Sequence, residues 1–227
     1  MNVALPPPGV GGLGLPPGGA TRPAAPVRRE IAGLMAVVLR LIDQHGSVVL
    51  YFTAVSHGEG TSTIARELAV TAARAAWCKV ALVDASAASG VENGTPGLLD
   101  VPADAADLAF SRAWFGDAEL LEAALSASSA VPSVEAVRGL FERLRTQFTL
   151  VVVDGPPTAA ARHAAAFSAA ADYVVLVVEA ERTRASDLER ARAALEQLGG
   201  RMLGMVLNKR RSWVPGRLSR LIWGEAP

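Results

Sequence analysis

A short stretch rich in glycine and hydroxyl residues, SHGEGTST at 56–63, has the composition of a phosphate-binding loop. Gly58 and Gly60 permit backbone conformations that turn successive N–H groups toward one point, and Ser62 stands where a hydroxyl would contact Mg²⁺. The usual pattern, G-x-x-x-x-G-K-[ST], has a lysine that neutralises the β- and γ-phosphates, and Thr61 holds that place here. The loop therefore predicts a phosphate site without its usual cation; a tight strand-to-helix turn is the simpler alternative.

Two aspartates follow apolar runs and could complete such a site. Asp84 ends KVALVD, and Asp154 ends FTLVVVD. A carboxylate after an apolar strand can hold a metal, directly or through water, or orient a nucleophile, although many such residues are only turn or cap formers. Because ligands bind at the carboxyl ends of the strands in parallel sheets, we expect both aspartates to face the glycine loop at one sheet edge.

The elements that must position these residues alternate between apolar strands and helices. Apolar runs predict strands at 47–54, 79–84, 148–154, 173–180 and 204–208. Helical spacing of apolar residues predicts helices at 27–44, 62–76, 134–146, 159–170 and 184–198, and the stretch 96–127 is expected to be helical with loops. The alternation predicts an α/β fold, a three-layer α/β/α domain with a mostly parallel sheet.

Composition bounds the class of protein. The 227 residues suit one domain with tails, and the balance of 22 basic and 22 acidic residues argues against a nucleic-acid-binding protein. No signal peptide and no apolar run of the roughly 18 residues that span a bilayer is found, so a cytoplasmic protein is expected. The single cysteine, Cys78, suits a reducing compartment and is expected to be a small buried residue.

The chain divides into three parts on composition. Residues 1–27 hold seven of the fourteen prolines and predict a disordered tail, and 28–208 form the folded domain. Residues 209–227 carry Lys209 and four arginines interleaved with tryptophan and leucine. Such a basic, aromatic segment could lie on an anionic membrane face, and a helix packed on its own domain is the alternative.

The ordered set of motifs resembles the bacterial tyrosine kinases (BY-kinases) of capsule and exopolysaccharide synthesis, within the ParA/MinD-like class of P-loop ATPases. The resemblance runs through residues ~30 to 215. The segments that carry it are FTAVSHGEGTSTIARELA, VALVDAS, GLLDV, LRTQFTLVVVDGPP, ADYVVLVVEAERTR and LGMVLNKRR.

This resemblance implies roles for individual residues. The phosphates of ATP or ADP would be wrapped by Gly58, Glu59, Gly60, Thr61, Ser62 and Thr63. Ser62 and Asp154 would hold Mg²⁺, and Asp84 would assist the metal or activate the acceptor, so that the two aspartates are the catalytic candidates. Asn208 lies where the family often contacts adenine; a polar turn at the strand end is the alternative.

The chain also departs from the family pattern. Thr61 replaces one loop lysine, and His57 stands near the place of a second. The C-terminal tyrosine cluster that family kinases phosphorylate is missing, and the two tyrosines, Tyr51 and Tyr173, fall in predicted strands. These departures predict a degenerate, regulatory or scaffolding protein with weak or no ATP turnover.

Other functions remain open alternatives. These are an active ATPase or tyrosine kinase acting on a partner, and a ParA/MinD-like positioning ATPase. The family implies an inner-membrane polysaccharide co-polymerase or chain-length regulator as partner. The composition of 209–227 suggests peripheral membrane contact or docking on a membrane partner. Homo-oligomerisation is also implied, although the arginine pattern of the family's oligomerisation motif is absent from the helix that Glu30 begins.

Overall fold

The structure is a computed structural model. It describes residues 29–75, 78–86, 97–99, 108, 110–115, 118–125 and 131–209. The proline-rich tail expected at 1–27 lies outside the described residues, and so does the basic, aromatic segment except for Lys209. In the described part of the chain, no helix is long and apolar enough to cross a membrane.

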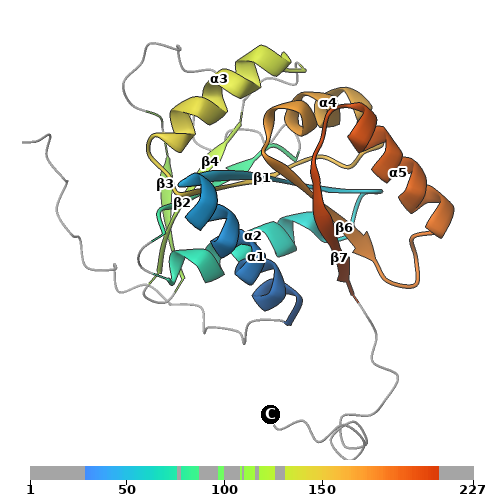
Figure 1. Ribbon diagram of the computed structural model, residues 1–227, viewed down its shortest axis with the longest axis horizontal. Helices are drawn as coiled ribbons and strands as arrows, with labels where there is room; N and C mark the ends of the chain where they lie inside the picture. Colours follow the sequence, from blue (N-terminus) through green and yellow to red (C-terminus); the bar gives the residue numbers. More distant parts are fainter. Residues whose placement is uncertain are drawn as a thin grey trace, which may run out of the picture.

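In the part of the chain that the structure describes, seven strands form one sheet, in the order β3-β4-β2-β5-β1-β6-β7 (Figure 1). Neighbouring strands pair in parallel, except for the antiparallel pair β3 and β4. The strands are β1 Val48–Ala54, β2 Val80–Asp84, β3 Ser111–Phe115, β4 Ala118–Ala124, β5 Leu150–Asp154, β6 Tyr173–Glu179 and β7 Met202–Asn208. The α/β fold with a mostly parallel sheet, as predicted, is confirmed.

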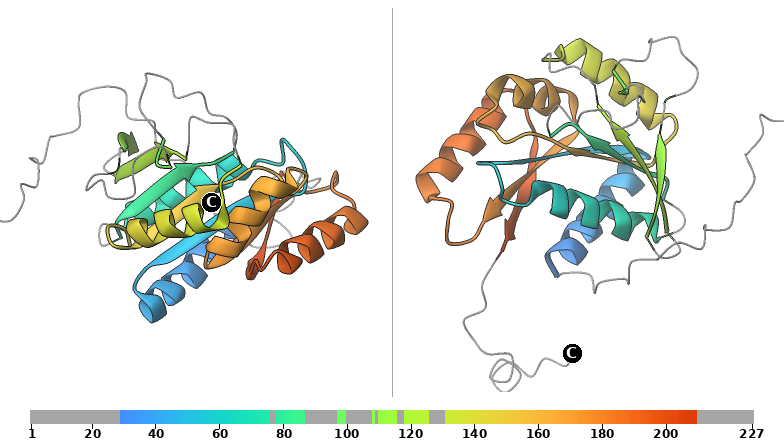
Figure 2. Two further views of the ribbon diagram at one scale, coloured as in Figure 1. Left: turned by 90° about the horizontal axis from the view of Figure 1, so that it is seen from above. Right: turned by 180° about the vertical axis from the view of Figure 1, so that it is seen from behind.

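Among the described residues, five helices cover the two faces of the sheet (Figures 1 and 2). They are α1 Arg29–His45, α2 Thr61–Ala73, α3 Val134–Arg145, α4 Ala161–Ala170 and α5 Ala185–Gln197. Side chains alternate along the central strand, so Leu50 and Phe52 pack with α1 and α2, whereas Val49 and Tyr51 pack with the opposite layer of helices. Strand β1 is therefore buried on both faces, which explains why its sequence is continuously apolar.

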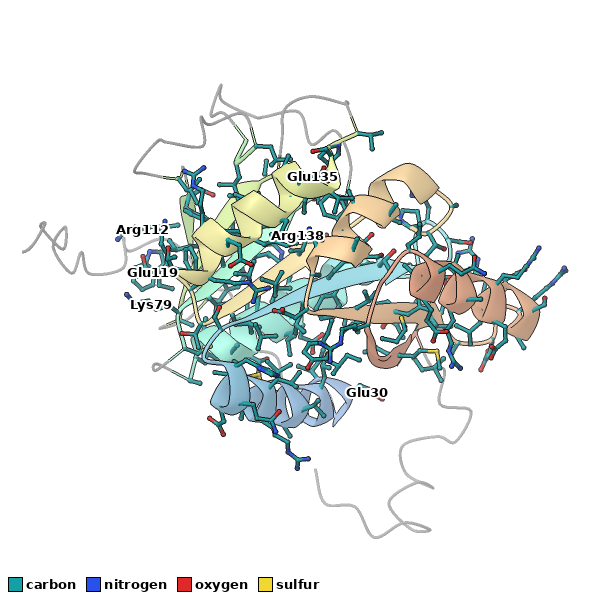
Figure 3. The ribbon with its side chains drawn as sticks, turned by 45° about the horizontal axis from the view of Figure 1, so that its top comes forward. Glu30, Lys79, Arg112, Glu119, Glu135 and Arg138 are labelled. Carbon is teal, nitrogen blue, oxygen red and sulfur yellow. The ribbon has the colours of Figure 1, made fainter. Side chains whose placement is uncertain are left out.

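The expectation of helix with loops at 96–127 is wrong for the part that the structure describes. Strands β3 and β4 form an antiparallel hairpin there, with Ala113 opposite Leu120. Although AELLEAA favours a helix, pairing of β4 with β2 and burial of Leu120 outweigh this local preference. An exposed ion pair, Arg112 Nη1 to Glu119 Oε1 at 3.2 Å, joins the two strands near Lys79 (Figure 3).

The remaining elements agree with the predicted ones to within a few residues at each end. Their ends bring the loop after β1, the end of β2 and the end of β5 to one edge of the sheet, because β5 lies between β1 and β2 and all three are parallel. This edge is where the sequence placed the site.

Candidate functional site

The glycine loop connects β1 to α2. Gly58 and Gly60 have φ values of 82° and 94°, a backbone conformation that favours glycine. Gly60 is also the N-cap of α2 and offers no side chain to the first amides of the helix. The amides that begin α2 are thus left for an anion at the positive end of the helix, as a phosphate loop requires.

Asn208 packs directly against this loop. Its Nδ2 donates a hydrogen bond to the Glu59 carbonyl oxygen at 2.8 Å, and a Cβ atom on Gly60 would lie only 2.1 Å from that nitrogen. Glycine is therefore required at 60 by a close approach as well as by its φ value. The structure brings Asn208 to the loop, and its contact with adenine stays a prediction.

The carboxylate of Glu59 fastens the loop to its surroundings. Glu59 is buried; its Oε2 accepts from the Val55 N–H at 3.0 Å and its Oε1 accepts from the Thr183 hydroxyl at 2.6 Å. Both oxygens of its side chain thus bind other residues of the protein, and only its backbone is left to contact phosphate, as the sequence predicts for this loop. No local sequence pattern indicates Thr183, because it lies 124 positions away from Glu59, in the turn after β6.

Lys209 is a second residue that the sequence analysis did not place at the site. Its Nζ donates to the Gly58 carbonyl oxygen at 2.6 Å and to Glu179 Oε2 at 3.1 Å. The hydrogen bond from Lys209 is the largest cause that lowers the pKa of the Glu179 carboxyl, and Arg182 also contributes. The only signal in the sequence was its place directly after Asn208.

The two predicted carboxylates are neighbours. Asp84 and Asp154 occupy paired positions at the ends of β2 and β5. Burial raises the pKa of Asp154 to about 6; the Ser62 side-chain hydrogen bond opposes this rise, the Asp84 charge adds to it and Arg66 opposes it. The structure therefore brings Ser62, Asp84 and Asp154 together, as predicted.

One carboxylate oxygen at this point lacks a partner. Asp154 Oδ1 is buried and accepts no hydrogen bond from the described residues, which is costly unless a ligand supplies the missing contact. A hydroxyl and carboxylates are the oxygen donors that Mg²⁺ prefers, and such sites commonly use one or two carboxylates together with substrate phosphates. The residues present therefore fit Mg²⁺, and its binding stays a prediction.

Asp84 also has a structural role. Its Oδ1 accepts from the backbone N–H of Ser86 at 2.9 Å and from the Ser86 hydroxyl at 2.7 Å, which stabilises the turn after β2. The alternative interpretation of Asp84 as a turn former is thus supported for this oxygen. Among the described residues, no group of three or more His, Cys, Asp or Glu side chains could hold a metal.

The segment after Asp154 is locked onto β1. The Tyr51 and Thr53 hydroxyls donate to the Pro156 carbonyl oxygen at 3.3 and 2.7 Å. Tyr51 is fully buried, and burial raises the pKa of its phenol above the ordinary value. Tyr51 is therefore a structural residue, and its hydroxyl is not accessible to a phosphate donor.

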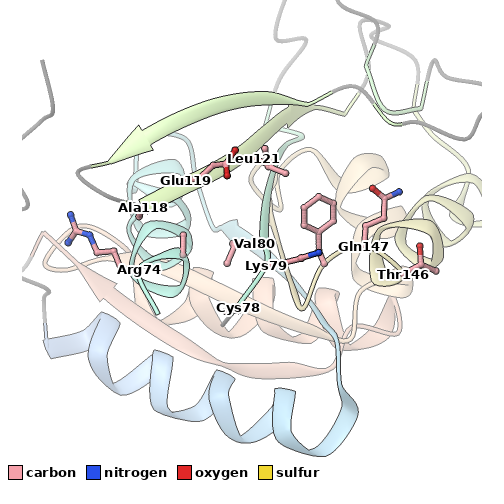
Figure 4. A pocket seen from close by; sticks show the side chains of 11 residues that line it. Arg74, Cys78, Lys79, Val80, Ala118, Glu119, Leu121, Thr146 and Gln147 are labelled. Atoms are coloured by element: carbon pink, nitrogen blue, oxygen red, sulfur yellow. The ribbon is translucent and has the colours of Figure 1, made fainter. Parts of the chain in front are cut away.

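Two cavities differ in their relation to this site. The larger, about 690 Å³, is lined by residues at the starts of β2, β4 and β5, including Lys79 and Glu119, and so lies at the opposite sheet edge (Figure 4). The smaller, about 420 Å³, is lined by Val55 and Thr158 together with one side of α5, and adjoins the point where the loop leaves β1.

Comparisons with known proteins agree with this geometry. No family model matches the chain. The tyrosine-protein kinase CpsD of Streptococcus agalactiae is 30% identical over 180 residues, which cover 71% of this chain and 75% of that protein. CpsD of Streptococcus pneumoniae serotype 4 is 28% identical over 174 residues, with the same coverage of 71% and 75%.

Solved structures share the fold. The kinase domain of the Escherichia coli tyrosine kinase ETK matches with a TM-score of 0.66 at 21% identity, over 82% of this chain and 78% of that one. The chimerical protein CapA2B2 matches with a TM-score of 0.64 at 24% identity, over 84% and 88%. The MinC:MinD complex of Aquifex aeolicus has a TM-score of 0.57 at 20% identity, over 77% and 72%. With the sequence match to CpsD, these findings place the chain in the bacterial tyrosine-protein kinase (BY-kinase) family.

Proposed function

We propose that this chain is a degenerate BY-kinase that binds ATP or ADP weakly, turns ATP over slowly or not at all, and has a regulatory or scaffolding role in exopolysaccharide biosynthesis or export. The observation that carries the proposal is Thr61 in a loop that otherwise keeps the geometry of a phosphate site. A cation that offsets charge on the transferred phosphoryl group contributes several kcal/mol to catalysis, so its loss lowers turnover on the order of a hundredfold or more.

The rest of the site supports nucleotide binding. The amides at the start of α2 would hold phosphate oxygens, and Ser62 and Asp154 would hold Mg²⁺ with help from Asp84. Mg²⁺, when bound, would neutralise phosphate charge. The chain's own part is to orient the phosphates and to offer the metal a buried ligand, Oδ1 of Asp154, which has no hydrogen-bond partner among the described residues.

The tyrosines support a role without self-phosphorylation. Tyr51 is fully buried, and Tyr173 lies in β6 with the Arg201 guanidinium 5.1 Å from its ring centroid. A scaffold would act through partners, and the family resemblance suggests an inner-membrane polysaccharide co-polymerase or chain-length regulator, with self-association as a further possibility. In this proposal the domain at 28–208, together with Lys209 on its glycine loop, binds nucleotide and partner, while 1–27 and the rest of 209–227 are tails.

The alternative is an active ATPase or kinase that phosphorylates a partner. It is favoured by the intact metal side of the site, where Ser62, Asp84 and Asp154 converge. A positioning ATPase of the ParA/MinD type shares this fold but has no further observation in its favour.

Phosphate release separates these functions. The wild-type chain is expected to release phosphate from Mg-ATP near the rate of the Asp154→Ala variant, whereas Thr61→Lys should raise the rate above both. Release by the wild type that disappears in Asp154→Ala would establish the active enzyme. Binding of the chain to the cytoplasmic part of a co-polymerase, measured with and without nucleotide, tests the scaffolding role separately.

A further inference from the structure

Lysine is rare in this chain, and its placement is informative. Only Lys79 and Lys209 occur in 227 residues, and every other basic residue except the three histidines is arginine. Lys79 lines the cavity at the amino edge of the sheet (Figure 4). Lys209 lies on the glycine loop itself, with Nζ 2.6 Å from the Gly58 carbonyl oxygen. One of the two lysines therefore lies at the loop in which Thr61 replaces the usual lysine.

The sheet order shows which side of the loop Lys209 serves. Asp84 and Asp154 end β2 and β5 on one side of β1, whereas Lys209 follows β7, two strands away on the other side (Figure 1). In P-loop sites the metal lies with the β- and γ-phosphates. The β- and γ-phosphates would therefore lie on the side of Asp84 and Asp154. The nucleoside and the α-phosphate attached to it would lie on the side of β7.

Contacts on several sides hold Lys209 in place. Its ammonium also donates to Glu179 Oε2 at 3.1 Å, and its neighbour Asn208 is bonded to the carbonyl of the next loop residue. An ammonium has three N–H donors, and these two contacts use two of them. The third N–H is thus left for an oxygen of a bound ligand, as far as the described residues go.

We propose that Lys209 is the binding cation of this site and acts on its nucleoside side, so that nucleoside diphosphates and triphosphates bind with nearly equal affinity. The inference rests on the proposed nucleotide binding. Thr61 gives a γ-phosphate no charge to contact, whereas Lys209 contributes equally to ADP and ATP, since both share the nucleoside end. The protein would then sense the presence of adenine nucleotide and respond little to the ratio of ATP to ADP.

Equilibrium titration of the full chain with Mg-ADP and Mg-ATP tests the proposal. Wild-type dissociation constants for the two are expected within about threefold of each other. Lys209→Met should weaken both about tenfold and by the same factor, because it removes one charge-assisted hydrogen bond. Lys209→Arg should retain part of the affinity, and the matched control Lys79→Met should change neither constant.

Contrary results are equally clear. If Lys209→Met weakened the affinity for ATP far more than that for ADP, the lysine would contact the γ-phosphate. If it weakened neither affinity, Lys209 would not belong to the nucleotide site. A wild-type chain that binds neither nucleotide at millimolar concentration also overturns the inference. It leaves the scaffolding role standing, since that role is measured by partner binding.

Chemical labelling gives a second readout of position. The 2′,3′-dialdehyde of ADP condenses with a nearby lysine amine, with loss of water, to an imine that borohydride reduces to a stable amine. Peptide mapping is expected to find Lys209 labelled, Lys79 unlabelled, and the label suppressed by excess ADP. Equal labelling of both lysines, or labelling that ADP does not suppress, would contradict a nucleoside-side lysine.

Discussion

Among single residues of the site, Asp154 stands out because its carboxylate is buried but incompletely hydrogen-bonded within the described residues. It is a buried acid beside a second carboxylate, it receives a hydrogen bond from Ser62, and its Oδ1 has no partner among the described residues. A residue chosen for stability alone would not be placed this way, because burial of an incompletely paired charge is costly. Such conflicts concentrate at sites where a ligand completes the contacts.

The conflict predicts a pH-dependent stability. Burial raises the pKa of Asp154 to about 6, so between pH ~4 and ~6 the folded chain holds a proton that the unfolded chain releases. Stability is thus lost as the pH rises through this window. The loss reaches up to about 3 kcal/mol, at 1.36 kcal/mol per pKa unit. Asp154→Asn, which stays neutral, is expected to be more stable than wild type at pH 8 by roughly 1–3 kcal/mol and similar near pH 4.

Urea unfolding of both proteins at several pH values measures this difference. Asp43→Asn, the same substitution at an exposed position on α1, is the matched control for the change of side chain. Addition of Mg²⁺ should stabilise the wild type at pH 8 and leave Asp154→Asn unchanged. A stability difference that is the same at pH 4 and pH 8 would contradict the raised pKa.

Gly155 leads to a second prediction at this scale. A Cβ atom at 155 would lie 2.0 Å from Cε2 of the Tyr51 ring, and that ring is fully buried against Phe167. Gly155→Ala should therefore destabilise the protein by about 1–3 kcal/mol or more, because the ring has no room to move. Thermal or urea unfolding measures the cost.

Gly139 provides the matched control for that change. It is exposed on α3 with no atom within 4 Å of an added Cβ, so Gly139→Ala should stabilise the helix by roughly 0.5–1 kcal/mol. Trimming the ring in the double variant Tyr51→Leu, Gly155→Ala should cost less than the sum of the single changes. Strict additivity would show that the ring is not the cause.

Helices and strands could be predicted from the sequence where the local pattern of apolar residues was long and uninterrupted. The apolar runs ending at Asp84 and Asp154 identified buried parallel strands, and parallel strands necessarily bring their carboxyl ends to one edge. The convergence of Ser62 with both aspartates could thus be predicted. The contacts of Glu59 with Thr183 and of Gly58 with Lys209 could not, because they join residues 124 and 151 positions apart.

The hairpin was missed for a different physical reason. The sequence AELLEAA consists of good helix formers, and nothing local reveals that β2 has an open edge beside it. Once paired, β4 alternates, with Ala118 and Leu120 buried and Glu119 exposed. Pairing with a distant strand therefore outweighed the intrinsic preference of the segment.

This alternation can be tested with one buried and one exposed leucine. Leu120 is fully buried with the α1 and α2 layer, so Leu120→Ala should cost about 2–4 kcal/mol of unfolding free energy. Leu207 on the edge strand β7 is 50% exposed, and Leu207→Ala should cost no more than about 0.5 kcal/mol. Chemical denaturation of both variants gives the comparison, and equal costs would contradict the burial of Leu120.

For the molecule as a whole, the distribution of charge matters more than its sum. The chain is formally neutral, with 22 basic and 22 acidic residues, so any attraction to an anionic surface must be local. The basic residues after β7 begin at Lys209, which the structure places on the glycine loop, so the segment 209–227 starts beside this loop.

Membrane attachment through this segment is the last prediction. Each basic residue near an anionic bilayer contributes about 1 kcal/mol, and the attraction falls as salt screens it. The chain should therefore float with phosphatidylglycerol vesicles at low salt and dissociate at high salt. A variant with glutamine at Arg210, Arg211, Arg217 and Arg220 should stay in the soluble fraction. Lys209 is left unchanged in that variant so that nucleotide binding is not altered. Equal flotation with neutral phosphatidylcholine vesicles would mean that the tryptophans and leucines of 209–227, and not its charges, carry any attachment.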